Sequence, residues 1–304
     1  MCCQPATLYY AWQVEVMIKS FVNNGINLNH VDILCAVTKE SDIMAWIALA
    51  DNYAARVFFY KDDRPTPRQY VSSVRPWILA KHFEKHSYLS EEAIFYHDCD
   101  IALTKPINFS RFEEGDDWYG SDVRFYISHQ YIIGKGEDVL QKMCEIVGIS
   151  QDIVKNNELN CIGAQYLMKN IDSNFWMDVY RDSENLFRDI TILNIQKKKE
   201  NPAHHELQIW CADMWAVLWN GWKRGKRTIV DEELKFSWGN SSEQEWNKNA
   251  IFHNAGVTGP DQGFFYKALF QKSLPYDSNL DIKPFTASNK YYQLIKSVET
   301  KLLK

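Results

Sequence analysis

AIFYHDCDI, residues 93–101, is an apolar run that ends in two carboxylates one residue apart, Asp98 and Asp100. Residues i and i+2 of a strand point to the same side, so both side chains can aim at one place beyond the strand's carboxyl end. Open α/β sheets bind ligands at that edge, and two hard oxygen ligands suit Mg²⁺ or Mn²⁺. The alternative is a strand that runs into an Asp-rich turn, because Asp favours turns.

The composition indicates an ordinary globular protein with a sizeable core. The chain has 304 residues, of which 46% are hydrophobic and 24% charged. Its net charge of −5 provides no global attraction to nucleic acid or to anionic membranes, so a nucleic-acid partner is not favoured. Aromatic residues make up 14% of the chain, and they are either core residues or surfaces that stack on sugars and bases.

The cysteines and the amino-terminal residues predict a cytoplasmic protein. Seven cysteines form an odd, scattered set without a C-x-x-C pair, which is typical of reduced thiols. The first residues lack a basic region followed by an apolar run. No stretch reaches the roughly 18 apolar residues of a membrane span. We therefore expect neither export nor a membrane anchor.

The first third of the chain alternates between helical and strand patterns, and then reaches the two carboxylates. This β-α-β-α-β order is typical of a parallel sheet covered by helices. The first strand of this order, which should precede the first helix, is nearly absent from Met1 to Thr7. The expected segments are a helix at 8–21, a strand at 31–37, a helix at 42–53, a strand at 55–60, a loop at 62–67 and a helix at 70–83.

The second part of the chain is less regular. Short strands are expected at 119–121 and 131–133, and helices at 137–147, 163–169 and 206–222. The charged segment at 197–202 is expected to be a solvated loop, with an acceptor-binding basic patch as the alternative. No repeat and no convincing linker interrupts the chain, which predicts a single domain with a helical C-terminal elaboration.

Two further segments carry side chains that suit the same site. Arg75 lies about twenty residues before the carboxylates, and its planar fork suits phosphate, although a surface ion pair explains it as well. In IFHNAGV, residues 251–257, a short apolar run delivers His253 and then Gly256. Imidazole is a common ligand of divalent ions, and glycine lets backbone approach a phosphate closely. A lone histidine is more often structural, but the paired carboxylates favour a ligand here.

Gln165 and Asp213 are polar residues within apolar surroundings. They occur in NCIGAQY, residues 160–166, and in WCADMWA, residues 210–216. A buried polar group without a partner is costly, so each one needs a hydrogen-bonding partner or a ligand. Contacts to a substrate are one interpretation; a helix cap for the loop of Gln165 and a satisfied core carboxylate for Asp213 are the other.

These segments together resemble the GT-A-fold, nucleotide-sugar-dependent glycosyltransferases, over about residues 8 to 270. The resemblance implies a Rossmann-like, mostly parallel sheet flanked by helices, with a D-x-D motif, Asp98 and Asp100, that holds Mn²⁺ or Mg²⁺ on the donor diphosphate. The glycogenin-like branch adds a donor-binding Arg and the pattern H-x-x-G-x-x-K, which Arg75, His253 and Gly256 fit. Gly259 stands where the lysine belongs, and Lys267 is the substitute. The segment 212–215 also looks like the plant-type peptidyl arabinosyl- and galactosyltransferases.

The resemblance implies transfer of a hexose or pentose from a nucleotide-sugar, foremost a UDP-sugar, to a hydroxyl acceptor. Retention, in which the leaving phosphate assists, is the expected outcome, and inversion with Asp213 as the base is the alternative. The acceptor is a glycan, a protein or a modified nucleobase. Asp213 and Gln165 are the expected catalytic contacts, and Tyr9 or Tyr10 would stack on the base. The expected halves are a nucleotide-binding part at about 1–125 and an acceptor-binding part at about 126–275, followed by a tail at 276–304.

Two other functions compete with this one. A metal-dependent nucleotidyltransferase or phosphohydrolase also uses paired carboxylates, but it predicts a glycine-rich phosphate loop or more clustered carboxylates, and neither is evident. A non-catalytic carbohydrate-binding protein of similar fold would keep the aromatic residues and would need neither Asp98 nor Asp100.

Overall fold

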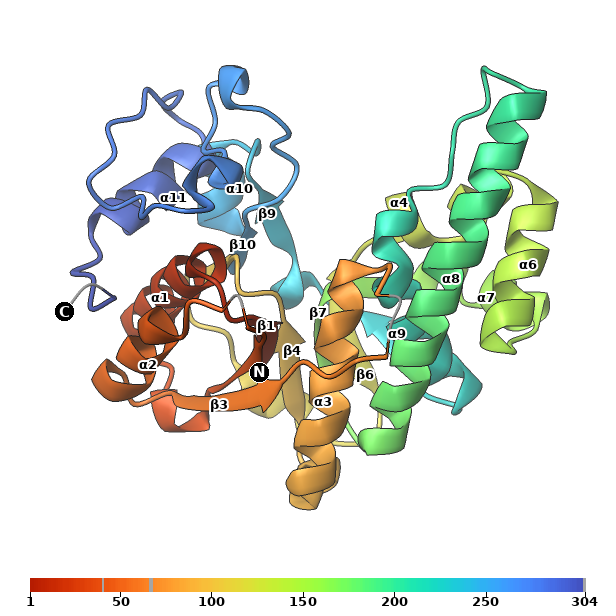
Figure 1. Cartoon of the computed structure of the whole chain (residues 1–304), viewed down its shortest axis with the longest axis horizontal. Helices are drawn as coiled ribbons and strands as arrows, with labels where there is room; N and C mark the ends of the chain where they lie inside the picture. The colour runs from red at the N-terminus through yellow and green to blue at the C-terminus, as the bar shows by residue number, and fades with distance from the viewer. Residues whose placement is uncertain (40, 66–67, 303–304) are drawn as a thin grey trace. The chain divides into compact units, whose positions relative to one another are not determined.

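The computed structural model describes residues 1–39, 41–65 and 68–302, and it is a mixed α/β structure (Figure 1). It divides into two compact units, which are described separately. Unit 1 comprises Met1–Asp62, His97–Arg111 and Glu232–Lys304, and unit 2 comprises Asp63–Tyr96 and Phe112–Asp231. The single domain stays a prediction. Thr66 and Pro67 of the expected loop, and the last two residues of the expected tail, lie outside the described residues.

Unit 1 begins with a three-stranded parallel sheet that alternates with helices. Strand β2 lies between β1 and β3, and α1 packs against α2. The prediction of a nearly absent first strand is wrong, because Cys2 pairs with Ile33 and β1 is buried. Four residues are too few for a periodic pattern, and only the pairing with β2 reveals this strand. The elements are β1 (Cys2–Pro5), α1 (Leu8–Asn23), β2 (Asp32–Val37), α2 (Ile43–Asn52) and β3 (Arg56–Lys61).

A second sheet of unit 1 brings distant parts of the sequence together. The central strand β10 (Ile251–His253) is antiparallel to β5 (Ile101–Leu103) and parallel to β9 (Phe236–Trp238). His253 lies opposite Ile101, and Ile101 is the residue that directly follows Asp100, the second carboxylate of the D-x-D motif. Helices α10 (Glu243–Lys248) and α11 (Ala287–Lys296) complete the unit and pack on each other.

Unit 2 is built on a mixed four-stranded sheet, in the order β4-β7-β6-β8. Strand β6 is antiparallel to β7 and parallel to β8, and its register shifts between Gly120 and Ser121. The described residues therefore form three small sheets, and the expectation of one mostly parallel sheet is corrected. The strands are β4 (Ile94–His97, whose last residue belongs to unit 1), β6 (Trp118–Asp122), β7 (Ile162–Met168) and β8 (Thr228–Val230).

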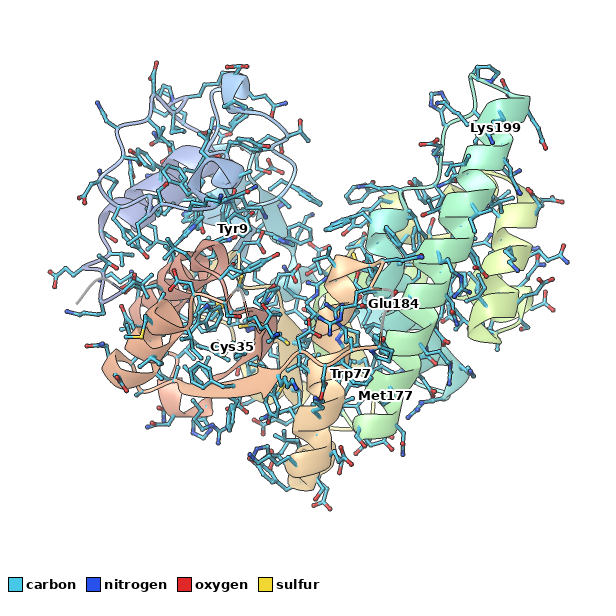
Figure 2. The ribbon with its side chains drawn as sticks, in the orientation of Figure 1. Tyr9, Cys35, Trp77, Met177, Glu184 and Lys199 are labelled. Carbon is cyan, nitrogen blue, oxygen red and sulfur yellow. The ribbon has the colours of Figure 1, made fainter. Side chains whose placement is uncertain are left out.

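Three helices form the main layer of unit 2: α3 (Val74–Lys85), α8 (Ser173–Glu200) and α9 (Ala212–Lys223). Both α3 and α9 pack on α8 (Figure 1). Figure 2 shows Trp77 on α3 beside α8, where its ring lies 4.9 Å from that of Tyr180, centroid to centroid. The shorter helices are α4 (Arg124–Ile127), α5 (His129–Ile133), α6 (Glu137–Val147) and α7 (Gln151–Asn156).

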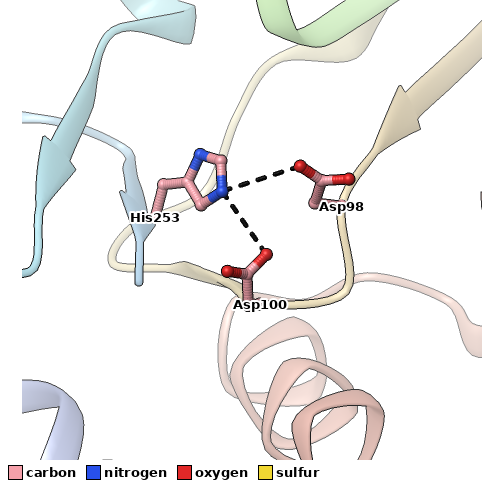
Figure 3. Close-up of side chains that lie close together, drawn as sticks. All are labelled: Asp98, Asp100 and His253. Carbon is pink, nitrogen blue, oxygen red and sulfur yellow. Dashed lines mark ion pairs between the residues drawn. The ribbon is translucent and has the colours of Figure 1, made fainter. Parts of the chain in front are cut away.

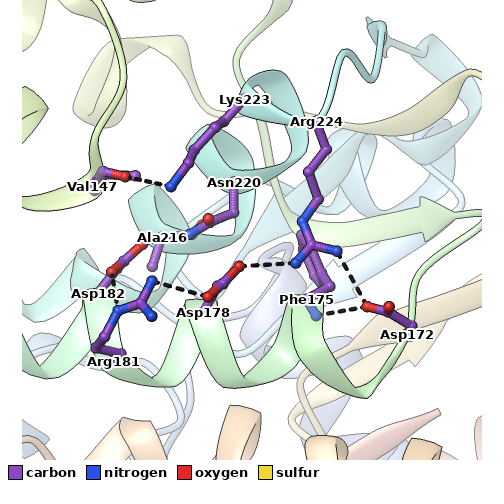
Figure 4. Close-up of polar contacts among 10 residues, drawn as sticks. All are labelled: Val147, Asp172, Phe175, Asp178, Arg181, Asp182, Ala216, Asn220, Lys223 and Arg224. Carbon is purple, nitrogen blue, oxygen red and sulfur yellow. Dashed lines mark hydrogen bonds and ion pairs between the residues drawn. The ribbon is translucent and has the colours of Figure 1, made fainter.

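A polar network joins α8 to α9 (Figure 4). Arg224 pairs with Asp172 at 3.2 Å and with Asp178 at 2.9 Å. Deeper inside, Asn220 donates to Asp182 at 2.9 Å, and burial raises the pKa of that carboxyl. Because buried polar groups need their partners, this network holds α9 at one position along α8.

Several predicted elements of the second part need correction. The expected helix at 163–169 is strand β7, since a short buried apolar run fits either structure and only pairing with β6 decides. The expected strand at 131–133 belongs to α5, which Ser128 caps. The expected helix at 206–222 begins later, as α9 at Ala212, and Asn194 bonds both backbone groups of Leu207, which lies outside the helix.

Helix α8 continues to Glu200, so most of the expected loop at 197–202 is its last turn, with Lys199 near its end (Figure 2). The expected strand at 119–121 and helix at 137–147 are confirmed as β6 and α6.

Burial accounts for most tryptophans and all cysteines. Trp12, Trp46, Trp118, Trp176, Trp215 and Trp219 are fully buried, so these rings fill the cores. All seven cysteines are free thiols and buried. Among the described helices, none has the length and apolar character that a membrane span requires.

Candidate metal centre and polar cluster

Asp98, Asp100 and His253 form the candidate metal centre (Figure 3). The turn between β4 and β5 carries both carboxylates, and β10 carries the histidine. Its Nε2 lies 3.7 Å from Asp98 Oδ2 and 3.4 Å from Asp100 Oδ1, and one ligand atom from each residue lies within 4.8 Å of the others. The backbone N–H of Asn254 donates to the carbonyl of Asp100 at 2.9 Å, which ties the two segments together.

Lys267 belongs to the same cluster, and its ammonium forms an ion pair with Asp100. Burial opposes ionisation of Asp100, but the charge of Lys267 and the imidazole of His253 outweigh it and hold the pKa of this carboxyl well below its usual range. Burial also lowers the pKa of Lys267, but the Asp100 carboxylate more than offsets this and raises it. Asp100 is therefore an anion and Lys267 a cation at neutral pH.

The donor set fits a divalent cation. Two carboxylates supply hard oxygen atoms, which suit both Mg²⁺ and Mn²⁺. One imidazole supplies a nitrogen atom, a ligand type that suits transition metals better than Mg²⁺. The side chains of Asp100 and His253 are 9% and 10% exposed, whereas that of Asp98 is 27% exposed. Asp100 and His253 are therefore largely buried, and Asp98 is the carboxylate that is more accessible to solvent.

The other candidates of unit 1 lie at different places around this centre. Tyr9, on the first turn of α1, is close enough to Lys267 and Asp100 for their charges to act on its phenol, although burial is the main reason why its pKa is raised. Tyr10 packs edge-on against Tyr9, with centroids 4.9 Å apart. Gly256 has a φ of +83°, which L side chains rarely adopt, and Gly259 has open space around it.

Unit 2 brings Arg75 and Asp213 together, which the sequence treated as separate candidates. Arg75 of α3 forms an ion pair with Asp213 Oδ2 at the first turn of α9. Tyr70 donates to Asp213 Oδ1 at 2.6 Å, and its hydroxyl also lies 2.6 Å from the carbonyl of Trp210. Burial, and then the Asp213 carboxylate, raise the pKa of Tyr70 well above its usual value. Both oxygens of Asp213 therefore have a partner.

Gln165 is fully buried on β7 in unit 2, and Ser121 of β6 donates to its side-chain oxygen at 2.6 Å. The preceding residue, Ala164, has a φ of +61°, and the register of β6 against β7 shifts at Gly120. Irregular backbone of this kind often accompanies functional sites. The structure gives Gln165 a protein partner and an unusual backbone environment.

Sequence reasoning missed three residues of these clusters: Tyr70, Ser121 and Trp238. Tyr70 is the first residue of the expected helix at 70–83, which carries Arg75, but only the arginine has a side chain whose chemistry points to a phosphate. Trp238, on β9, lies beside His253. The alternation Phe236-Ser237-Trp238 is a strand signal that sequence reading can find, but its pairing with β10 is not visible locally.

Comparison with known proteins finds matches among solved structures alone, since no family model and no curated protein matches the chain. The WbbM bifunctional glycosyltransferase aligns with a TM-score of 0.49 and 10% identity over 85% of this chain and 46% of its own, so the chain spans about half of that protein. An active-site mutant of LgtC gives a TM-score of 0.46 and 14% identity, over 98% of this chain and 95% of its own. Mouse xyloside xylosyltransferase 1 gives a TM-score of 0.41 and 11% identity, over 85% of this chain and 98% of its own. These neighbours over most of the chain are GT-A glycosyltransferases, at identities too low for the likeness to assign an activity.

Proposed function

We propose that this chain is a metal-dependent glycosyltransferase of the GT-A fold. It moves a hexose or pentose from a nucleotide-sugar, foremost a UDP-sugar, to a hydroxyl of a glycan, a protein or a modified nucleobase. The observation that carries the proposal is the cluster of Asp98, Asp100 and His253, whose ligand atoms lie within 4.8 Å of one another although the histidine is far away in sequence.

Each residue of the centre has a role that its chemistry supports. A divalent ion bound there supplies positive charge for a departing nucleoside diphosphate. Asp98 and Asp100 offer oxygen ligands and His253 offers nitrogen. Lys267 is proposed to bind a phosphate oxygen, the role that the resemblance gives to the lysine at the position of Gly259; its ammonium beside Asp100 supports this role. Gly256 leaves room for close approach of the phosphate, and Tyr9 or Tyr10 binds the base.

Asp213 is proposed as a positioning carboxylate, which supports retention. Tyr70 and Arg75 each hold one oxygen of Asp213, and the positive charge of Arg75 stabilises the carboxylate as an anion, which favours a positioning role over that of a general base. In a retaining transfer the leaving phosphate can accept the acceptor's proton. Asp213 and Gln165 stay predictions as contacts to sugar hydroxyls, and Arg75 stays a prediction as a contact to the donor.

Isothermal titration calorimetry tests the proposal with UDP-, GDP- and dTDP-sugars, first with Mn²⁺ and then with EDTA. We expect one nucleotide series to bind with Mn²⁺ and to lose binding in EDTA. The double variant Asp98→Asn with Asp100→Asn should keep its fold and lose this binding, because its ligands are neutralised without a change in volume.

The matched control is Asp261→Asn with Asp281→Asn, which makes the same charge change at two exposed positions of unit 1. It should bind as the unchanged chain does. Absence of donor binding in the presence of Mn²⁺ contradicts the proposal, as does retained metal-dependent binding in the Asp98 and Asp100 variant. Hydrolysis of the phosphate bond without sugar transfer to any acceptor favours the phosphohydrolase alternative instead.

A further inference from the structure

Trp238 and His253 are cross-strand neighbours in the second sheet of unit 1. The register of β9 against β10 sets Trp238 opposite His253, and Phe236 opposite Ile251. The rings of Trp238 and His253 are almost parallel, with an interplanar angle of 8° and centroids 6.2 Å apart. This separation lies within the range of offset-stacked aromatic pairs. Phe236 contacts the same imidazole at a tilt, with centroids 5.5 Å apart.

The orientation of the imidazole decides whether His253 can bind a metal together with Asp98 and Asp100. The last side-chain torsion of histidine is broad, so the backbone and the rotamer alone do not fix the plane of the ring. Neighbours must fix it, and residues that orient metal ligands contribute strongly to metal affinity. The nearly parallel indole of Trp238 restricts rotation of the His253 ring, which keeps its Nε2 toward the two carboxylates.

Trp238 also contacts the second functional candidate of this segment. A Cβ atom at Gly256 would lie 3.3 Å from Trp238 Cε3, tighter than most real contacts. The glycine also has a φ of +83°, so any side chain there is strained. The indole of Trp238 thus lies against both the imidazole of His253 and the backbone of Gly256. A shift of the turn at Gly256 would therefore displace Trp238, the residue that orients His253.

We propose that Trp238 is the positioning residue of the metal centre: it holds the plane of His253 and couples this plane to the turn at Gly256. The inference rests on the proposed function, because it takes Asp98, Asp100 and His253 as the metal ligands. It assigns to Gly256 a structural role against Trp238 that acts even when no phosphate is bound.

The test measures the affinity for Mn²⁺ alone, by calorimetry and by electron paramagnetic resonance, without any nucleotide. Trp238→Leu should weaken Mn²⁺ binding by about 10-fold, the lower end of what loss of an orienting residue costs. Trp238→Phe keeps a flat ring and should recover most of this loss. The control Trp246→Leu removes an indole that packs on Phe252, whose side chain lies on the other face of β10, and it should leave Mn²⁺ affinity unchanged.

Two further measurements separate positioning from general damage. Ring-proton NMR shifts of His253 should change in Trp238→Leu and stay in Trp246→Leu, because only the first loses the ring current of the stacked indole. Gly256→Ala should weaken Mn²⁺ binding in the unchanged background and do so much less in Trp238→Leu, since coupled residues are not additive.

Each outcome separates this inference from the proposed function. If the unchanged chain does not bind Mn²⁺, the metal centre and the inference fail together. If it binds Mn²⁺ and Trp238→Leu binds equally well, or if Trp238→Phe loses as much affinity as Trp238→Leu, the metal centre stands and the role of Trp238 is overturned. Additive effects of Gly256→Ala and Trp238→Leu overturn the coupling alone.

Discussion

Lys267 and Asp100 show how single residues set the electrostatics of the candidate centre. The lysine is the carboxylate's ion-pair partner, and its side chain is 29% exposed against 9% for Asp100. A buried carboxylate without a counter-charge is costly, so the ion pair keeps Asp100 ionised inside the protein. The same ammonium is the residue that we propose for phosphate binding. Unfolding experiments without a donor measure the contribution of Lys267 to stability, apart from its proposed role in donor binding.

Lys267→Met should lower the free energy of unfolding by about 1–3 kcal/mol, the usual cost of leaving a buried charged group without its partner. Since the pKa of Asp100 is lowered in the folded state, its contribution is complete above the unfolded value near 4 and declines progressively as the pH falls from there through the lowered pKa of the folded state. Since the pKa of Lys267 is raised, its contribution exists below about 10 and is lost in more alkaline solution.

Urea unfolding of the unchanged chain and of Lys267→Met across this pH range measures the effect. The two curves should differ most between about pH 5 and 10 and converge in acid. Lys272→Met, at an exposed position of unit 1, is the control and should follow the unchanged chain. A difference that does not shrink as the pH falls below about 4 contradicts the ion pair as its cause.

Tyr70→Phe should destabilise the protein although it removes one oxygen atom. The hydroxyl contacts Asp213 Oδ1, the carbonyl of Trp210 and the backbone N–H of Asp213, all within 3.3 Å. Its loss leaves buried polar groups without a partner, at about 1–3 kcal/mol. Guanidinium unfolding measures the change, with Tyr88→Phe, 52% exposed, as the control. Equal stability of the two variants would show that these contacts contribute nothing.

At the scale of elements, the packing of α9 on the sheet of unit 2 depends on a glycine. A Cβ atom at Gly221 would lie 2.6 Å from Cζ3 of Trp118, a distance that real Cβ atoms do not adopt. Trp118 is fully buried and donates its Nε1 proton to the carbonyl of Lys169 at 2.9 Å, so the ring has no room to move. Close approach of α9 to β6 is therefore the reason for a glycine inside this helix.

Gly221→Ala should lower stability, although alanine is the better helix former. The gain in helix propensity is about 1 kcal/mol, whereas forcing an extra methyl group into a packed core costs about 1–3 kcal/mol. Thermal unfolding followed by circular dichroism measures the net change. Gly259→Ala, where nothing lies within 4 Å, is the control and should change little. A more stable Gly221→Ala variant would mean that α9 can move away from β6.

At the scale of the whole molecule, the described chain folds as two compact units whose segments alternate along the sequence, and each unit has its own tryptophan-rich core. All seven cysteines lie inside these cores. Burial raises the pKa of Cys2, Cys161 and Cys211 to about 12, and of Cys144 to about 11. Because the thiolate is the reactive form, and these groups are both protonated and inaccessible, they are inert in the folded protein.

The folded protein should therefore react slowly with a thiol reagent such as Ellman's reagent at mildly alkaline pH. In concentrated guanidinium chloride all seven thiols should react at once, because unfolding exposes them and returns each pKa to its ordinary value. The absorbance of the released thiolate counts the reacting groups. Rapid reaction of any thiol in the folded protein contradicts its assigned burial.

The local elements were largely predictable from the sequence, and the pairing of distant segments was not. Periodicity located α1, β2, α2 and β3, because each shows a continuous local pattern. It failed at β1 and β7, where a short apolar run takes its form from the strand beside it. It also predicted one sheet, whereas the part of the chain that the structure describes forms three, since strand order depends on contacts between remote segments.

The sequence by itself determined the chemistry of the candidate site: a strand that ends in Asp98 and Asp100, and a second apolar run that ends in His253. The spacing of the carboxylates is local, so the period of a strand is enough to predict their common direction. Only the tertiary structure decided that Lys267 pairs with Asp100, that Arg75 and Tyr70 engage Asp213, and that Trp238 stacks on His253. These contacts join residues that are distant in sequence, and burial and strand pairing, rather than any local pattern, select them.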